Sequence, residues 1–575
     1  MNNTNLPNQT PAEPLRRRVI QHLWVLLALI AIAQAVYTAS DYGNYLGEDE
    51  WWTTYTVLRG STGAVVDRPL GLINLMPVYW LVGPHMASTQ FFLTALRVAI
   101  AFLIYLIVWH FQPRKLLFAF TCGAVYLLWI ENHFIYVASY ARMGNLWMNV
   151  FSALLAIYLY CKYMAQPRPV TLLLAAIVAG ISIMGYESGI PLLFAASFII
   201  IIYRRNLSRA RMVGFAVWLG AVILFTQNYV LRLCGILPRG YGAGLFVSLD
   251  PLRMIRMSAG HYVDLFSPLA FTGPINIAPY LLPISAALAA YGVGSLVMRR
   301  QTPADGECPG AWSDWRVYLT WLAVGLVAIW LGFAAFLPTI LIELGEGRVD
   351  FLTMPGIAVV LASLMWFAGT PIPHQGLRRM VRGIALILVV SFGISTIGRV
   401  QDDMYTYDGT WETEAIYMRS LASMIPDVTP NTLFIYMQPS DQGEAPFVSG
   451  WSFEYSLRYA YEDRATGILP DDNQVISSWS IQEDGIAITP NPGEEGLAAA
   501  YTSFHRWDEI IFVTRDENYR AVILEEIPPE FYAPERAAAY DPYGRIEAEA
   551  FVPEPIRELY PPIQRLPQAP DLVLR

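Results

Sequence analysis

Residues 170–203 read VTLLLAAIVAGISIMGYESGIPLLFAASFIIIIY, and Glu187 is the one charged residue among them. Each half of the stretch is an apolar run close to the length of about 20 residues that an α-helix needs to cross a bilayer. Gly185, Gly189 and Pro191 surround Glu187, and such residues favour a turn over a continuous helix. The stretch therefore predicts two membrane-crossing helices joined by a short turn that holds one carboxylate.

Similar apolar runs recur throughout the first 400 residues. The whole chain is 55% hydrophobic and 15% charged, whereas a soluble domain carries about 25% charged residues. The stretch from Leu70 to Val82 is short and contains Pro77, so we expect it to lie at the membrane interface rather than to cross. The sequence predicts an α-helical polytopic membrane protein with eleven spans, near residues 21–38, 88–110, 115–130, 146–164, 170–186, 189–203, 212–231, 276–297, 317–337, 351–369 and 383–399.

The charges divide the chain into two parts. Residues 1–400 hold 27 of the 38 basic and 16 of the 47 acidic residues, and residues 401–575 hold the other 11 and 31. We therefore expect a transmembrane body at 1–400 and an acidic soluble domain at 401–575. The acidic charge of the soluble domain excludes nucleic-acid binding by it, because such binding requires a basic surface. The four cysteines have no disulfide or zinc-ligand spacing, so the sequence predicts no structural metal.

The soluble part contains alternating helix and strand patterns. Strands are predicted at 432–437 and 510–514, and helices at 411–424 and 453–461, which together favour a small α/β domain. The segment from Ile527 onward is rich in proline and acidic residues, so we expect it to be extended or poorly ordered.

The basic residues of the loops predict the orientation. If the end with Arg16, Arg17 and Arg18 is cytoplasmic, the cytoplasmic loops carry 17 basic residues and the opposite loops carry 8. Basic residues accumulate on the cytoplasmic side, and an odd number of spans then places the soluble domain outside the cytoplasm. We expect a multi-pass protein of the plasma (inner) membrane.

Four short motifs fall in the loops that this orientation places outside. The first contains Asp49 and Glu50 followed by two tryptophans, and carboxylates there suit a general base as well as an ordinary solvated turn. The second is Arg68-Pro69-Leu70, and the third is the turn at Glu187, which is either functional or a helix cap. The fourth runs from Gly347-Arg348 to Asp350, with Pro355 beyond it. Arg68 either binds a lipid phosphate or makes ordinary headgroup contacts, and Arg348 either binds a phosphate or makes a structural ion pair.

This combination resembles the multi-spanning glycosyltransferases of the C superfamily (the GT-C fold), and within it the protein O-mannosyltransferase-like branch. The matches are Asp49-Glu50, Arg68-Pro69-Leu70, Tyr186-Glu187 with Pro191, and Gly347-Arg348 with Pro355. Two features depart from that branch. Its lysine before the glutamate is replaced by Tyr186, and its early histidine and asparagine have no counterpart in residues 90–97.

The resemblance implies a bacterial cell-envelope glycosyltransferase with a polyprenyl-phosphate sugar donor and a glycan, lipid or protein acceptor. It assigns Asp49 as the base, with Glu50 beside it, and places Arg68, Arg142, Glu187 and Arg348 around the donor phosphate. No cofactor is implied with certainty, because related enzymes differ in whether they need a divalent metal. Two other functions remain open: a transporter or flippase for lipid-linked glycans, and an inactive scaffold in envelope assembly.

Overall fold

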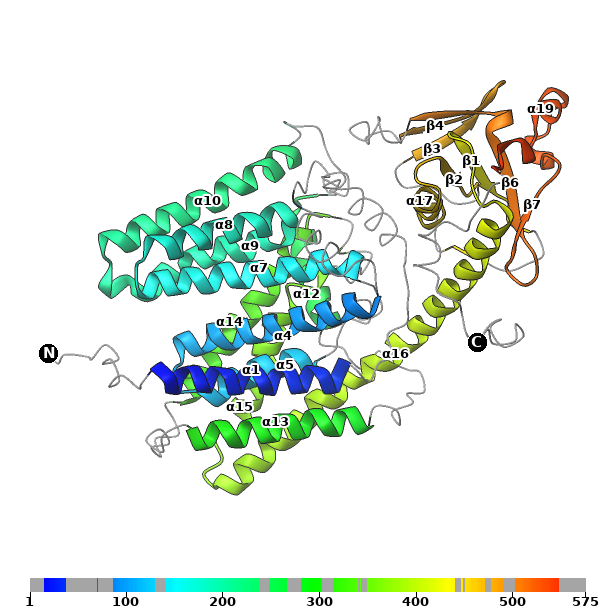
Figure 1. Cartoon of the computed structure of the whole chain (residues 1–575). Helices are drawn as coiled ribbons and strands as arrows, with labels where there is room; N and C mark the ends of the chain where they lie inside the picture. The colour runs from blue at the N-terminus through cyan, green and yellow to red at the C-terminus, as the bar shows by residue number, and fades with distance from the viewer. Residues whose placement is uncertain are drawn as a thin grey trace.

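A computed structural model of the chain describes residues 15–37, 70, 86–129, 140–234, 236, 248–265, 281–301, 314–339, 342, 349–439, 446–447, 450–470, 477–490 and 502–547. Up to residue 390 the described part is a bundle of helices that lie side by side, and a small α/β domain follows it (Figure 1). The helices of the bundle are α1 (Leu15–Tyr37), α4 (Met86–Phe111), α5 (Leu116–Leu128), α7 (Tyr140–Ala165), α8 (Pro169–Gly185), α9 (Ile190–Ala196), α10 (Arg209–Leu233), α12 (Pro251–Leu265), α13 (Leu281–Gln301), α14 (Asp314–Phe333), α15 (Met354–Ala368) and α16 (Gln375–Met424), with the 3-10 segments η1 (Glu187–Gly189), η2 (Ser197–Asn206) and η6 (Ala334–Phe336).

The described helices account for the predicted spans. Six segments are long and apolar enough to cross a bilayer: α1, α4, α7, the run from η1 through η2, α10 and α14. Shorter apolar helices correspond to α5, α8, α13 and α15, and the first half of α16 supplies the remaining segment. The prediction of a polytopic α-helical body is confirmed.

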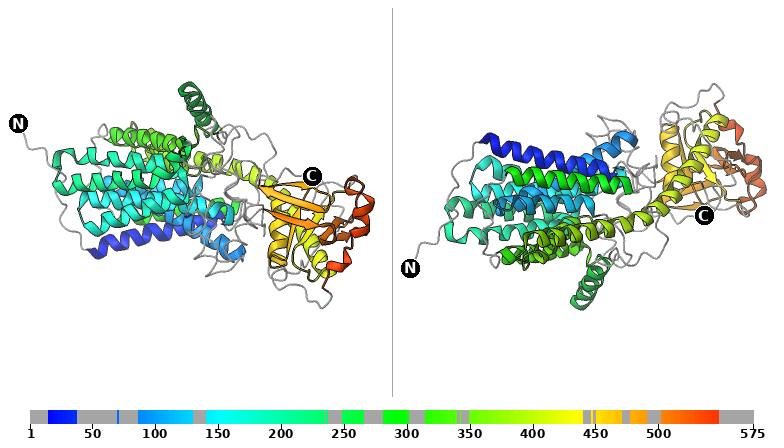
Figure 2. Two further views of the ribbon diagram at one scale, coloured as in Figure 1. Left: turned by 90° about the horizontal axis from the view of Figure 1, so that it is seen from above. Right: turned by 90° about the horizontal axis from the view of Figure 1, so that it is seen from below.

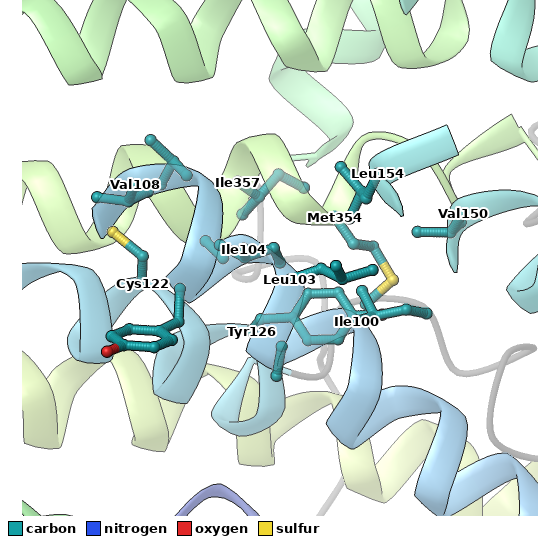
Figure 3. Packing of buried hydrophobic residues seen from close by; sticks show 14 of the residues in the cluster. Ile100, Leu103, Ile104, Val108, Cys122, Tyr126, Val150, Leu154, Met354 and Ile357 are labelled. Carbon is teal, nitrogen blue, oxygen red and sulfur yellow. The ribbon is translucent and has the colours of Figure 1, made fainter. Parts of the chain in front are cut away.

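Two of the short helices, α5 and α15, form the centre of the bundle. Every residue of α5 except Leu117 is buried, and α15 packs against it and against α14. Figure 3 shows this core, where side chains of α4, α5, α7 and α15 meet, among them Ile104, Cys122, Leu154 and Ile357. At 1.5 Å per residue, α5 is about 20 Å long, shorter than the bilayer core of about 30 Å; its neighbours on all sides shield it from lipid.

Glycines allow α14 and α15 to approach closely. A Cβ on Gly332 would lie 2.7 Å from the backbone of Leu352, and a Cβ on Gly356 would lie 2.8 Å from the backbone nitrogen of Ile329. Small residues permit this kind of contact between membrane helices. The close approach places the end of α14 and the start of α15 at the same level of the bundle.

The peripheral helices expose large apolar side chains. Leu282 of α13 is 80% exposed, Val170 of α8 is 68% exposed and Ile202 of η2 is 63% exposed. Such a surface suits lipid rather than water. Arg253 and Arg256 belong to α12, an amphipathic helix.

The long helix α16 connects the bundle to the α/β domain. It runs without interruption for 50 residues, so the helix predicted at 411–424 is present and is continuous with the helix of the last span. The start of α1 and the α/β domain lie at opposite ends of the bundle (Figures 1 and 2). We call the end nearer the α/β domain the domain end, and the other the N-terminal end.

The α/β domain has three layers. Its larger sheet has the order β2-β1-β6-β7 and is formed by β1 (Thr432–Tyr436), β2 (Ala465–Ile468), β6 (Ile510–Arg515) and β7 (Ala521–Ile523), with β7 antiparallel to β6 and the other pairs parallel. The end of α16 and α17 (Gly450–Ala460) pack on one face of this sheet. The smaller antiparallel sheet of β3 (Ser477–Ile481), β4 (Gly485–Pro490) and β5 (Ser503–Arg506) covers the other.

One expectation for this domain is wrong. The segment from Ile527 to residue 547 is not poorly ordered but contains η11 (Pro529–Phe531), α19 (Pro534–Ala539) and η12 (Tyr543–Arg545). Phe531 is 2% exposed and packs on Phe512 of β6, and the hydroxyl of Tyr540 donates a hydrogen bond of 2.6 Å to the backbone oxygen of Leu524. A few aromatic anchors therefore hold this proline-rich chain against the sheet. The rest of the segment, residues 548–575, lies outside the described residues.

Candidate active site at the domain end of the bundle

The turn at Glu187 is built around a buried asparagine of the neighbouring helix. The side-chain amide of Asn149 in α7 donates hydrogen bonds to the backbone oxygens of Ser182, at 2.7 Å, and Tyr186, at 3.0 Å. Its oxygen accepts a bond of 3.1 Å from the hydroxyl of Ser188. Asn149 is 2% exposed. One side chain therefore ties the last turn of α8 to the turn that follows it.

Glu187 itself is only 7% exposed. It begins η1, which continues directly into α9, with Pro191 in the first turn of that helix. The N-terminal end of a helix carries partial positive charge and stabilises a carboxylate. The local sequence thus explains how the chain reverses here within a few residues and how a carboxylate is held at the end of two helices.

The Arg-Pro-Leu motif reaches the same place through its last residue. The backbone nitrogen of Leu70 donates a hydrogen bond of 3.1 Å to the backbone oxygen of Met184, in the last turn of α8. Leu70 is separated from Glu187 by more than a hundred residues of sequence. The second and third motifs therefore meet at the domain end of the bundle.

The end of the fourth motif also lies at the domain end of the bundle. Phe351 packs edge-on against Trp147, with ring centroids 5.0 Å apart, and Trp147 lies only two residues before Asn149 in α7. On the other side of the turn, η1 contacts η6, where the ring of Phe336 lies 6.2 Å from that of Tyr186. Asp350 is thereby brought to the same end as Glu187.

A histidine of α12 pairs with Asp350. His261 Nε2 lies 2.7 Å from Asp350 Oδ1, and both side chains are largely buried, at 10% and 17% exposed. The guanidinium of Arg253, two turns earlier in α12, donates to the backbone oxygens of Leu337 and Thr339. These contacts anchor α12 across the chain that links α14 to α15.

A buried arginine completes this end of the bundle. Arg97 of α4 is 2% exposed, and its guanidinium carbon lies 5.0 Å from the ring centroid of Trp147. An indole face attracts a cation, and the same indole contacts Phe351. The domain end thus contains positive and negative groups in an environment that excludes much of the solvent, which strengthens electrostatic interactions.

The structure describes only some of the predicted site residues. Glu187 is described and is buried at the domain end. Asp49, Glu50, Arg68 and Arg348 lie outside the described residues, and so does the side chain of Arg142, whose backbone is in the first turn of α7. Among the described residues, no group of three histidine, cysteine or acidic side chains has an arrangement suited to a metal ion.

Sequence reasoning missed three side chains at this end: Asn149, Arg97 and His261. Asn149 and Arg97 were visible as polar residues inside apolar runs, and such residues usually face the interior of a bundle. His261 gave no such signal, because α12 is short and polar on one face. Its contact with Asp350 depends on tertiary packing.

Comparisons with known proteins find similarity among solved structures. No family model and no curated protein matches the chain. Among solved structures, the chain is similar to ArnT from Cupriavidus metallidurans bound to undecaprenyl phosphate, with 14% identity, 77% of this chain and 85% of that chain covered, and a TM-score of 0.30. It is also similar to the same protein in the apo state, with 14% identity, coverage of 80% and 87%, and a TM-score of 0.27.

Proposed function

We propose that this chain is an integral-membrane glycosyltransferase of the GT-C kind that transfers a sugar from a polyprenyl-phosphate donor to an acceptor hydroxyl at the domain end of the bundle. One observation carries the proposal. Leu70, Glu187 and Asp350 belong to three motifs that are far apart in sequence, and all three lie at the same end of the helical body. Two of these motifs also meet directly, because the backbone nitrogen of Leu70 bonds to Met184 in the last turn of α8.

In this reaction Asp49 takes the proton of the acceptor hydroxyl while the oxygen attacks the anomeric carbon of the donor sugar. Glu50 orients the loop. The polyprenyl phosphate leaves with increased negative charge, and Arg348, with Arg68 and Arg142, neutralises it. A guanidinium that meets this developing charge stabilises the transition state more than the ground state. Direct attack inverts the anomeric configuration.

The transporter alternative predicts ionisable groups in the middle of the membrane, where coupled transporters bind their ions. Up to residue 390, the acidic side chains that the structure describes are Glu187, Asp250 and Asp350. Glu187 is the first residue of the segment that runs from η1 through η2, and Asp250 and Asp350 lie shortly before α12 and α15, so none of the three lies in the middle of a span. This placement favours surface chemistry over ion-coupled transport.

The proposal is tested by incubating membranes that contain the protein with a panel of radiolabelled polyprenyl-phosphate sugars. Undecaprenyl phosphate, which the ArnT structure binds, supplies one lipid for the panel. Release of the lipid phosphate together with transfer of the label supports the proposal, and the Asp49→Asn protein is the control for background activity. Flipping of an intact donor across vesicle membranes without transfer would instead establish the transporter function.

The proposed topology predicts that the C-terminus lies outside the cytoplasm. The basis is the loop asymmetry of 17 to 8 basic residues, together with the location of the α/β domain and the start of α1 at opposite ends of the bundle. A phosphatase reporter that is active only outside the cytoplasm should be active when fused after Arg575. A reporter that is active only inside the cytoplasm should be silent there, and activity of that fusion would overturn the orientation.

Arg348 is predicted to bind the donor phosphate. Arg348→Lys keeps the charge but removes the two-pronged geometry of the guanidinium, so we expect weaker donor binding with an unchanged thermal unfolding midpoint. Arg348→Ala should weaken binding further. The measurement is donor affinity by titration of the purified protein, with Arg316→Ala, at the start of α14, as a control at the N-terminal end. Unchanged affinity in Arg348→Ala would remove this residue from the site.

A further inference from the structure

Helix α12 exposes its apolar side chains and turns its polar side chains towards the rest of the protein. Leu252, Ile255 and Val263 are 77%, 66% and 67% exposed. In a helix with 3.6 residues per turn they fall on one face, which we call the outward face; its members are Leu252, Ile255, Arg256, Ala259 and Val263, all of them exposed. A helix covered by water has the opposite arrangement, with its polar side chains outward. The outward face of α12 is therefore suited to an apolar environment.

Contacts near both ends of α12 fix the rotation of the helix about its axis. The guanidinium of Arg253 donates hydrogen bonds to the backbone oxygens of Leu337 and Thr339, just beyond α14. Nearer the other end of α12, His261 pairs with Asp350. Turning the outward face towards the bundle would break both sets of contacts. The outward face must therefore be covered from outside the bundle.

Two further contacts show at which level of the bundle α12 lies. The indole nitrogen of Trp330 donates a hydrogen bond of 3.3 Å to the hydroxyl of Ser258, and the hydroxyl of Tyr262 donates to the backbone oxygen of Leu326. The membrane-crossing segment that contains α14 ends at Phe336, so Leu326 lies about 15 Å inside the end of that span. Since the first turn of α12 also contacts the chain just beyond α14, the axis of α12 lies between these levels, about 8 Å inside the span.

The neighbouring surface of α14 indicates what covers α12 at this level. Amphipathic helices in a membrane bury their apolar face about 5–10 Å into the boundary between headgroups and acyl chains. Beside Leu326, the side chains of Val324 and Val327 are 47% and 56% exposed, and Trp330 is 42% exposed. Exposed apolar side chains on a membrane-crossing helix are covered by lipid. The outward face of α12 adjoins this surface, so the acyl chains of the same leaflet are its nearest cover.

The exposed charge on the outward face favours lipid over a second protein. Arg256 is exposed beside Ile255. The long apolar stem of an arginine allows its guanidinium to reach the headgroup region while the rest of the face contacts acyl chains, and lipid phosphates there attract the charge. A protein that covered the whole face would instead remove this charge from water, which is costly.

We propose that α12 is embedded in the leaflet at the domain end of the bundle, where acyl chains cover Leu252, Ile255 and Val263 and lipid phosphates contact Arg256. In this position α12 separates the lipid from the largely buried side chain of His261 and its partner. The partner of this surface is the phospholipid of the leaflet, and the inference does not depend on the proposed function.

The test places the photoreactive amino acid benzoylphenylalanine at Ile255 or at Val263 of the full chain, reconstituted in vesicles of phosphatidylglycerol and phosphatidylcholine. On irradiation this side chain inserts into a C–H bond that it touches. We expect the protein to gain the mass of one phospholipid at each position, as measured by mass spectrometry of the intact chain. The same substitution at Val293, which is 61% exposed in the middle of α13, is the positive control.

Two controls should give no lipid adduct. Met257 lies on the opposite side of α12 and packs against the core of the bundle, and Val522 is an exposed apolar residue of the α/β domain. Thermal unfolding verifies that each variant is folded; if the variant at Ile255 is not, Leu252 replaces it. A cross-link between two copies of the chain would overturn the lipid assignment. The absence of a lipid adduct at both test positions, with an adduct at Val293, would overturn the proposal.

Discussion

Asp49→Asn is expected to lower the turnover of the proposed sugar transfer by about 10²–10⁴-fold, the range that general base catalysis typically contributes. Asparagine has the same size and still forms hydrogen bonds, but it does not accept the proton of the acceptor hydroxyl. Expression and the thermal unfolding midpoint should therefore stay near the wild-type values. The measurement is the rate of label transfer from the polyprenyl-phosphate donor at saturating acceptor.

Glu50→Gln is the matched control for this experiment. It removes the neighbouring carboxylate from the same loop, and its effect should be milder if Glu50 only orients that loop. Full turnover in Asp49→Asn combined with a loss in Glu50→Gln would exchange the two roles. If neither substitution changes the rate, the acidic loop is only a solvated turn, and the base must be sought elsewhere, with Glu187 as the described carboxylate to examine.

The second large effect is expected for Asn149→Leu. Leucine has the same number and branching of side-chain heavy atoms, but it leaves the backbone oxygens of Ser182 and Tyr186 and the hydroxyl of Ser188 without the bonds that Asn149 makes. Each polar group left unsatisfied in a buried position costs about 1–3 kcal/mol. The thermal unfolding midpoint should therefore fall clearly, and the turn that carries Glu187 should lose its defined position.

Ser152→Ala provides the comparison on the same helix. The hydroxyl of Ser152 bonds only to backbone oxygens of its own helix, those of Met148 and Asn149, so its removal should have a small effect. We expect the activity per folded molecule to fall in Asn149→Leu and to be retained in Ser152→Ala. If the two variants behave alike, then the hydrogen bonds of Asn149 do not position the turn.

Much of the architecture was predictable because it depends on local sequence patterns. Apolar runs identify spans without any knowledge of their neighbours, and the reversal between Gly185 and Pro191 was visible from glycine and proline alone. The buried parallel strands β1 and β6 are continuous apolar runs, and they fall at the predicted places. The helix α17 begins at Gly450, three residues before the predicted start.

The errors arose where packing overrides local preference. The helix predicted at 411–424 is present, but the sequence did not show that it is continuous with the last span: α16 continues out of the bundle and packs its last turns, including Tyr417 and Leu421, on the sheet. The proline-rich segment after Ile527 was expected to be poorly ordered, yet Phe531 and Tyr540 pack against β6. Composition alone does not show whether a few aromatic residues will pack against a neighbouring sheet.

By itself, the sequence determined that this protein is a helical membrane body followed by an acidic α/β domain, and it predicted that the carboxylate and arginine motifs lie in loops on one side. These properties follow from the length of apolar runs and from charge, which act residue by residue. Only the tertiary structure decided that Leu70 bonds to the last turn of α8, that Asn149 holds the turn of Glu187, and that His261 pairs with Asp350. Such contacts join helices distant in sequence, and they are set by how the helices pack around α5 and α15, which no local pattern encodes.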